Sequence, residues 1–232
     1  MPDTVKNKYR YDVKNVHYIV GEQAATGAIS FTGATWKPLY GVKTMTADPQ
    51  GERTNHRADG INYVTTSDNT GYNVTLNQIL ADEDFQRDVL SYVKDASTGI
   101  TYEDANAEPK PFALAGEFTG SHEGIRWIFY NCIAGRTKIT GDNKDKQKDP
   151  DTDEFPITAS PTPFTIGGSE VMLVKGSVKK SDNETTYNQF FDHVIFPGDT
   201  VTPAQTPAQT PAQGETLTGD RKRGHENADS RD

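Results

Sequence analysis

Cysteine, basic charge and long apolar runs are all scarce in this chain of 232 residues. The single cysteine, Cys132, excludes a disulfide within the chain and a cysteine cluster for zinc. The longest run of bulky apolar residues, 127–130, is far too short to cross a bilayer, so we expect no membrane-spanning segment. The charged first residues lack the apolar stretch of a secretion signal, and we expect none.

Basic charge is outnumbered by acidic charge. Lys and Arg together number 24 against 33 Asp and Glu, which gives a net charge of -9. Proteins that grip the phosphates of nucleic acids do so with clustered Lys and Arg. The composition therefore argues against a protein that wraps DNA.

Motifs for catalysis or metal binding are also missing. The histidines are scattered and show no metal-binding spacing: His17, His56, His122, His193 and His225. The acidic run 149–153 begins like a calcium loop, but its sixth position is Glu154 instead of Gly and its twelfth is Ser160 instead of Glu. We expect no catalytic residue, no metal and no cofactor.

The composition changes sharply after residue 198. Residues 199–232 contain almost no bulky apolar side chains, only Val201 and Leu217, and they include the repeat TPAQTPAQTPAQ. Such a segment cannot bury enough apolar surface to offset the entropy of ordering the chain. The sequence therefore predicts one folded domain over residues 1–198 and a flexible linker and tail over 199–232.

Most of the folded domain is predicted to be β-structure. Residues 71–77 alternate apolar with polar side chains, as in a strand with one buried face. The expected strands are 13–20, 39–46, 71–77, 110–119, 125–133, 169–179 and 190–196. If a four-residue turn joins 110–119 to 125–133, Glu117 faces Arg126 across the hairpin.

Two kinds of segment interrupt the strands. Residues 82–94 begin with acids and place Phe85, Val89 and Val93 four residues apart, which predicts an amphipathic helix. Two long polar stretches, 47–70 and 135–160, are expected to be loops. The predicted fold is mainly β, a β-sandwich or partial barrel with one flanking helix and long polar loops.

Short motifs in a fixed order give the chain a resemblance to a known family. They are residues 14–20, 57–60 with Tyr63, 68–72, 111–114 and 126–132, with the acid-led helix among them. Together they resemble the major tail proteins of long-tailed, non-contractile bacteriophages, particularly those of Gram-positive hosts. The resemblance spans roughly residues 10–198 and covers no part of the TPAQ repeat.

The resemblance implies a structural subunit. Such proteins are β-sandwiches with one flanking helix that form six-membered rings, and the rings stack into the tail tube through which the genome reaches the host. It implies a virion protein, assembled in the host cytoplasm, whose partners are its own copies together with tape-measure and tail-terminator proteins. Duplex DNA is implied only as transient cargo.

Polar strand faces fit a tube with a wet lumen. Asn73, Thr75, Asn77, Glu117 and Thr119 stand on the polar sides of strands otherwise suited to a core, so we expect them to face the lumen; the alternative is an ordinary solvent-facing sheet surface. Duplex DNA carries one negative charge per ~1.7 Å of axis, so a neutral-to-acidic wall lets it slide without sticking.

The long polar stretch 47–70 is the expected ring-stacking loop. Rings that repeat along an axis need a contact between unlike surfaces, which generates an open filament. The loop carries charges of both signs that can complement a neighbouring ring: Asp48, Glu52, Arg53, Arg57, Asp59 and Asp68.

The alternative hypothesis is a monomeric β-sandwich binding module, carbohydrate-binding or immunoglobulin-like, on a flexible linker. Aromatic side chains on an exposed flat face would favour it. Trp36 and Trp127 instead stand in strand-like patterns typical of a core.

Overall fold

The computed structural model describes residues 12–119, 124–141 and 151–202, and the chain divides into two units, 1–202 and 203–232. The strands of the main sheet are β1 (Val13–Val20), β4 (Lys37–Pro38), β5 (Val42–Gln50), β8 (Gly71–Gln78), β11 (Phe112–Phe118), β12 (Ile125–Ala134), β13 (Asp153–Ala159) and β16 (Lys175–Lys179). Two-stranded ladders pair β2 (Glu22–Gln23) with β3 (Ile29–Ser30), β6 (Arg53–Ala58) with β7 (Ile61–Ser67), β9 (Val93–Lys94) with β10 (Thr101–Tyr102), and β14 (Thr162–Ile166) with β15 (Ser169–Leu173). The helices are α1 (Glu83–Val89) and α2 (Glu184–Asn188). Most of the predicted C-terminal tail lies outside the described residues.

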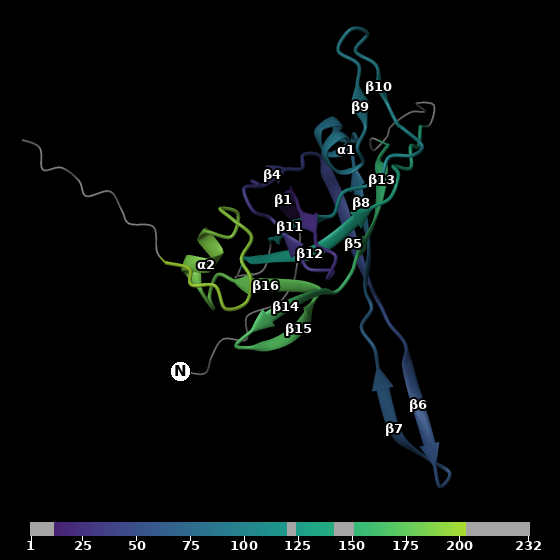
Figure 1. The fold of residues 1–232 in the computed structure, drawn as a ribbon, viewed down its shortest axis with the longest axis vertical. Coiled ribbons are helices and arrows are strands. Elements are labelled where there is room, and N and C mark those ends of the chain that lie inside the picture. The colour runs from purple at the N-terminus through teal and green to yellow at the C-terminus, as the bar shows by residue number, and fades with distance from the viewer. Residues whose placement is uncertain (1–11, 120–123, 142–150, 203–232) are drawn as a thin grey trace, which may run out of the picture. The chain divides into compact units, whose positions relative to one another are not determined.

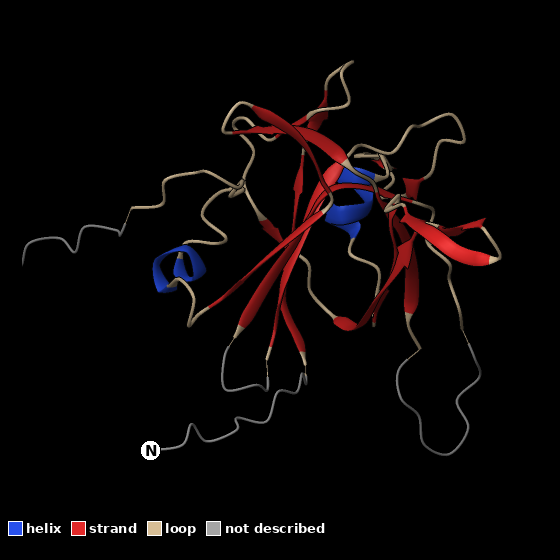
Figure 2. Ribbon diagram, turned by 90° about the horizontal axis from the view of Figure 1, so that it is seen from below, coloured by secondary structure: helices blue, strands red, loops and turns tan. Residues whose placement is uncertain are grey.

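The main sheet is antiparallel and follows the order β4-β1-β11-β12-β13-β8-β5, with β16 added on β12 (Figure 1). β12 pairs with β16 through residues 125–129 and with β13 through residues 132–134. Although β1 and β5 are far apart in this order, they lie against each other, so the sheet curls (Figure 2). The predicted fold, mainly β with a flanking helix, is confirmed.

Two apolar clusters lie on opposite faces of the sheet. Successive side chains of a strand point to opposite faces, and on β1 Tyr18 belongs to the first cluster and Ile19 to the second. In the first cluster the ring of Phe85, from α1, packs edge-on against Tyr18, Phe112 and Phe155 at centroid distances of 5.0, 5.5 and 5.2 Å. Helix α1 therefore anchors the first cluster.

The position of α1 is as predicted, but the helix is shorter than 82–94. The Asp82 carboxylate accepts a hydrogen bond from the backbone N–H of Phe85 at 3.0 Å, which caps the N-terminus. The helix ends before Ser91, whose φ of 61° is outside the helical range. Val93 then pairs with Tyr102 in the β9–β10 ladder instead of extending the helix.

The C-terminal part of the described chain covers the second cluster, and here the expected strand 190–196 is wrong. The chain forms helix α2 and then an irregular segment in which Phe190 and Val194 are buried. Phe196 stacks on Phe164 and Tyr130 at centroid distances of 4.7 and 5.3 Å. The apolar residues of this segment pack against the sheet without joining its ladder.

Three further boundaries differ from the prediction. The stretch 135–160 is not all loop, because its end forms β13, which buries Phe155 and Ile157. The expected strand 169–179 is divided at Val174 into β15 and β16. The expected loop 47–70 is largely β-structure, since β5 extends to Gln50 and β6 and β7 follow.

Candidate assembly surfaces

The strand pair β5–β8 continues beyond the sheet as an arm. The ladder runs from Val42 opposite Gln78 to Gln50 opposite Gly71, and β6 and β7 then pair as far as the turn at 58–61. The backbone bond from Asp68 N to Glu52 O, 3.0 Å long, joins the two ladders. We call residues 51–70 the arm (Figure 1). Every one of them is exposed.

The arm is ordered by its own turn and cross-strand contacts. Asp59 and Gly60 both have positive φ, 52° and 79°, as the centre of a type I′ hairpin turn requires. Arg57 Nε donates to Asn62 Oδ1 at 3.1 Å, and Thr65 Oγ1 donates to Asn55 Oδ1 at 2.8 Å. The arm therefore presents defined surfaces without support from the sheet.

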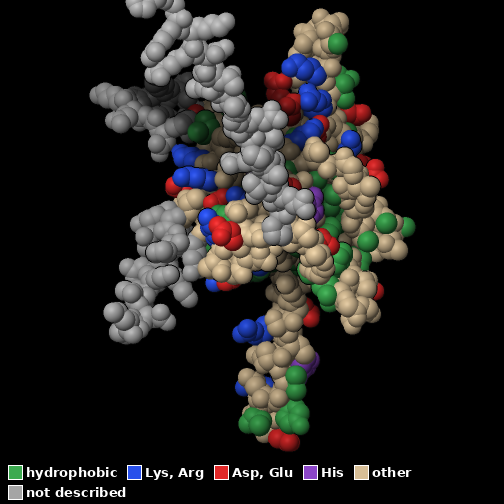
Figure 3. All heavy atoms as spheres, turned by 90° about the vertical axis from the view of Figure 1, so that its left-hand side faces the viewer, with side chains coloured by type: hydrophobic (Ala, Val, Ile, Leu, Met, Phe, Trp, Pro, Cys, Tyr) green, Lys and Arg blue, Asp and Glu red, His purple; other side chains and the backbone are tan. Residues whose placement is uncertain are grey.

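Large apolar side chains lie exposed near the end of the arm. Ile61 is 63% exposed, Tyr63 72% and Val64 46%. In Figure 3 hydrophobic side chains gather at this end of the arm. Grouped exposed apolar residues mark interaction sites more often than isolated ones do.

The structure places the predicted stacking residues in three settings. Arg53 and Arg57 lie on β6, and Asp59 forms the turn. Glu52 and Asp68 lie at the root of the arm, next to the joining backbone bond. Asp48 lies instead on β5, opposite Asn73, and belongs to the sheet.

Asp48 and Asn73 are part of a polar face shared by three neighbouring strands. The register brings together nine residues, which we call the polar face: Thr44, Thr46 and Asp48 of β5, Asn73, Thr75 and Asn77 of β8, and Glu154, Pro156 and Thr158 of β13. Buried residues such as Val74 and Leu76 alternate with them on β8. Asn77 Nδ2 donates to Thr44 Oγ1 at 2.8 Å, which links two of the strands.

The charges of the polar face are acidic. Asp48 and Glu154 are its charged members, and it contains no Lys or Arg. Two lysines lie at its border: Lys43 precedes Thr44 at the irregularity of β5, and Lys138 forms a β-bridge with Glu154. The strand face that the sequence indicated through Asn73, Thr75 and Asn77 is thus extended on both sides by polar neighbours.

Glu117 and Thr119 are placed elsewhere. The predicted pairing of Glu117 with Arg126 is confirmed, with Oε2 and Nε 3.3 Å apart, but the Glu117 side chain is only 13% exposed. Tyr187 of α2 donates its hydroxyl to Glu117 Oε1 at 2.7 Å. Thr119 is half-buried, and its N–H donates to Asp12 O at 3.0 Å. Glu117 is therefore enclosed by the fold and does not belong to the polar face.

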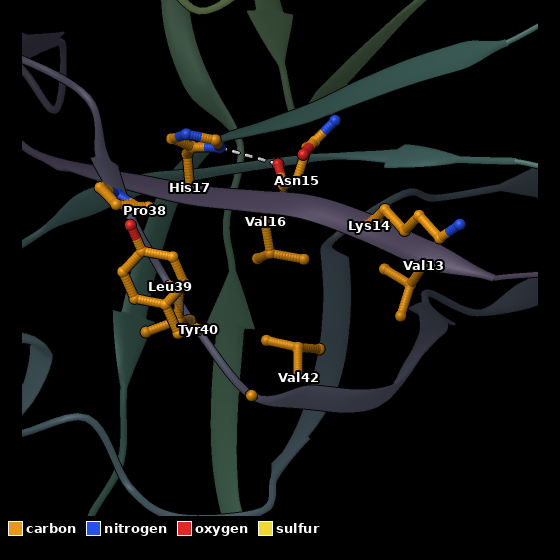
Figure 4. A pocket seen from close by; sticks show the side chains of 10 residues that line it. Val13, Lys14, Asn15, Val16, His17, Pro38, Leu39, Tyr40 and Val42 are labelled. Carbon is orange, nitrogen blue, oxygen red and sulfur yellow. Dashed lines mark hydrogen bonds between the residues drawn. The ribbon is translucent and has the colours of Figure 1, made fainter.

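A cleft of about 220 Å³ lies between β1 and the chain that leads into β5 (Figure 4). Val13, Val16 and Val42 line it, and His17 Nδ1 is 2.8 Å from Asn15 O at its border. Within the described part of the chain, β5 is paired along one edge, with β8, so its other edge is free. The sheet is thus open between β1 and β5.

Within the described ranges we find no candidate metal site, no helix suited to span a membrane and no reactive cysteine. Among these residues no group of three or more His, Cys, Asp or Glu side chains is arranged to hold a metal ion. None of the described helices has the length and apolarity needed to cross a membrane. Burial raises the pKa of the Cys132 thiol well above its usual value, which disfavours the reactive thiolate.

Comparisons with known proteins give a likeness to solved structures but none to family models or curated sequences. No protein-family model matches the chain, and no curated protein sequence matches it. Among solved structures, a similar chain is that of the cap that terminates the anti-feeding prophage tube, with a TM-score of 0.38 and 10% identity over 74% of this chain and 96% of that chain. The two chains are too distant for a function to be transferred between them.

Proposed function

We propose that this protein is the subunit of a phage tail tube, in which copies form rings of six and the rings stack around a channel for duplex DNA. The observation that carries the proposal is one continuous ribbon, β5–β8 extended by the arm, which combines an unpaired edge, a polar face and an exposed arm. Each of these features gains a role in an assembly. The proposal agrees with the sequence resemblance to major tail proteins.

The free edge of β5 supports assembly into a closed barrel. The edge strand β5 has nine residues, and although β1 lies against it, no ladder joins the two in the described chain, so its unpaired edge is a site for pairing with another chain. If β5 pairs with a strand of the next copy, the sheets join around the ring and no edge is left. The polar face, which contains β5, then forms part of a continuous wall.

The composition of the polar face supports a role as the lumen wall. Asn73, Thr75 and Asn77 are neutral, and the charged members, Asp48 and Glu154, repel phosphate. Such a wall does not bind DNA by counterion release, because that binding requires Lys or Arg. In this proposal DNA is a transient cargo, and the other partners are tape-measure and tail-terminator proteins.

The arm supports stacking along the tube axis. Its side chains are exposed and it holds its own hairpin geometry, so it can extend beyond one ring and contact another. Its charges include Glu52, Arg53, Arg57 and Asp59, and a complementary set on the next ring fixes its position.

Electron microscopy of the purified full chain tests the proposal. We expect rings and tubes for the natural sequence and for a chain that ends at residue 202, because the second unit is not needed for the ribbon. Replacement of residues 53–67 by a Gly-Ser link is expected to abolish tubes and to preserve the circular dichroism of the sheet. A natural chain that stays monomeric over a broad concentration range would refute the proposal.

The alternative, a monomeric binding module, has less support. Trp127 is 5% exposed, and Trp36 packs edge-on against Phe191 at a centroid distance of 6.2 Å. Neither tryptophan lies on an open flat face where a sugar ring could stack. The exposed aromatic residues Tyr40, Tyr63 and Tyr102 lie on turns and hairpins instead.

A further inference from the structure

A second group of exposed apolar residues lies at the opposite end of the ribbon from the arm. Tyr40 is 73% exposed, Ile79 49% and Leu80 76%, and we call these three residues the far-end patch. They follow directly on the Val42–Gln78 end of the β5–β8 ladder, whereas the arm follows on its Gln50–Gly71 end. At ~3.3 Å per residue, the ribbon separates the far-end patch from the tip of the arm by roughly 50 Å.

The far-end patch is held in place by hydrogen bonds. Gln78, which is fully buried, donates from Nε2 to the backbone oxygen of Tyr40 at 2.6 Å. Ile79 N donates to Gly41 O at 2.9 Å, and Ala81 N donates to Asp153 Oδ2 at 2.8 Å. The chain on both sides of Leu80 is therefore fixed, so binding a partner there requires little ordering of the backbone.

One basic residue beside the first apolar group has acidic residues to pair with beside the second. Near the tip of the arm, Arg57 is the one basic residue and Asp59 the one acidic residue, whereas Arg53 lies at the root, opposite Ser67 and next to Glu52. Next to Leu80, the acids that begin α1 outnumber the bases that pair with them: Asp82, Glu83 and Asp84 against Arg87 and Lys94. Arg57 of an approaching arm can therefore pair with an acid at the start of α1 in another copy.

We propose that the far-end patch receives the tip of the arm from the copy in the neighbouring ring, with Tyr63 and Ile61 packed against Tyr40 and Leu80. This inference rests on the proposed function and names the surface that the arm contacts. Because donor and acceptor lie at opposite ends of one ribbon, the contact is between unlike surfaces. Repetition of such a contact produces an open filament and leaves one arm and one patch free at its two ends.

Cross-linking between copies tests the contact. The chain is favourable for this, since its only cysteine, Cys132, is buried. Full chains with Tyr63→Cys and with Leu80→Cys are mixed and oxidised, and the products are separated on non-reducing gels. We expect at least ten times more disulfide-linked dimer from this mixture than from either variant alone. A chain with both substitutions should give a ladder of longer products.

Met172 provides the matched control, because it is 58% exposed and lies on β15, which pairs with β14 and with no strand of the ribbon. Tyr63→Cys mixed with Met172→Cys is expected to give only the background amount of dimer. An equal amount of dimer in this control, or abundant dimer from Tyr63→Cys alone, would overturn the proposed contact.

The outcomes separate the contact from the proposed function. If the natural chain forms tubes and the Tyr63–Leu80 pair does not cross-link, the arm binds another surface and this inference is wrong while the tube proposal stands. If the pair cross-links and no tube forms at any concentration, the head-to-tail contact is correct and the tube proposal is wrong. If neither occurs, both are wrong.

Discussion

Glu117 and Arg126 face each other across the β11–β12 hairpin, with Oε2 and Nε 3.3 Å apart and side chains only 13% and 16% exposed. The Arg126 guanidinium lies 4.2 Å from the ring centre of Tyr187 and 4.8 Å from that of Phe191. It also donates to the backbone oxygen of Tyr187. This pair therefore holds the α2 segment against the sheet.

Removing the carboxylate is expected to destabilise the fold. Glu117→Ala leaves the Arg126 charge in a largely buried site without its partner, and we expect a loss of about 3 kcal/mol in the free energy of unfolding. Urea denaturation measures it. Glu117→Gln, which still accepts from Tyr187, is the control and should lose less. Equal stability of Glu117→Ala and the natural chain would show that Arg126 does not need this partner.

Acid is expected to weaken the fold through Glu117 and Asp88. Burial alone would raise the pKa of Glu117, but hydrogen bonds from Tyr187 and Asn15 and the Arg126 charge lower it below the ordinary 4.5. For Asp88, burial is likewise outweighed, by the hydrogen bonds of Lys37 and Tyr18, and its pKa falls below 3.8.

The direction of this pH effect on stability follows from proton uptake. Each carboxylate binds protons more weakly in the folded chain, so the unfolded chain takes up more protons as the pH falls. Their contribution is present above about pH 5 and is lost as the pH falls below the ordinary values and then through the folded-state values. Unfolding curves recorded from pH 6 to pH 2 should show this loss, and Glu117→Gln combined with Asp88→Asn should flatten it. An unchanged slope in the double variant would contradict the assignment.

Two glycines should separate the stability of the sheet from the geometry of the arm. Gly71 has φ +122°, and an added Cβ would lie 2.1 Å from Ala159 O, so Gly71→Ala is expected to destabilise the fold by about 3 kcal/mol. Gly60 has φ +79° with nothing within 4 Å, so Gly60→Val strains only the turn of the arm. We expect Gly60→Val to unfold within about 1 kcal/mol of the natural chain but to form fewer tubes. If urea denaturation showed a larger loss of stability for Gly60→Val than for Gly71→Ala, the distinction between sheet and arm would be refuted.

A basic residue on the polar face should slow DNA transit. Asn73 is exposed and lies opposite Asp48, so Asn73→Lys places a cation on the proposed wall without disturbing the core. We expect normal virions whose DNA ejection is slowed at low salt and recovers as ionic strength rises. Met172→Lys, on a different part of the surface, should eject normally. Normal ejection by Asn73→Lys at low salt would exclude this face from the lumen.

The parts of the fold predicted from sequence are those where one face is buried. Helix α1 was visible because Phe85 and Val89 are spaced by one turn and follow an acidic start. Strand β8 was visible because Val74 and Leu76 alternate with polar residues. When one side of an element is buried, apolar residues recur in the sequence at the period of that element, and both of these elements show this recurrence.

The arm and the C-terminal segment lack that period for opposite reasons. Both faces of the arm are exposed, so its strands show no alternation, and the Asp59–Gly60 pair was the one local hairpin signal. The segment after α2 is apolar, but it packs through Phe190 and Val194 on a sheet formed by distant residues. The enclosure of Glu117 by Tyr187 likewise depends on residues 70 positions apart. Local patterns contain no information on such contacts.

The most direct measurement is a cryo-electron microscopy reconstruction of the assembled full chain. We expect stacked rings in which the polar face with Asn73 and Thr75 lines the channel, β5 pairs with the adjacent copy, and Tyr63 reaches Leu80 of the next ring. A reconstruction with the polar face on the outside of the tube, or a chain that forms no rings at any concentration, would contradict it.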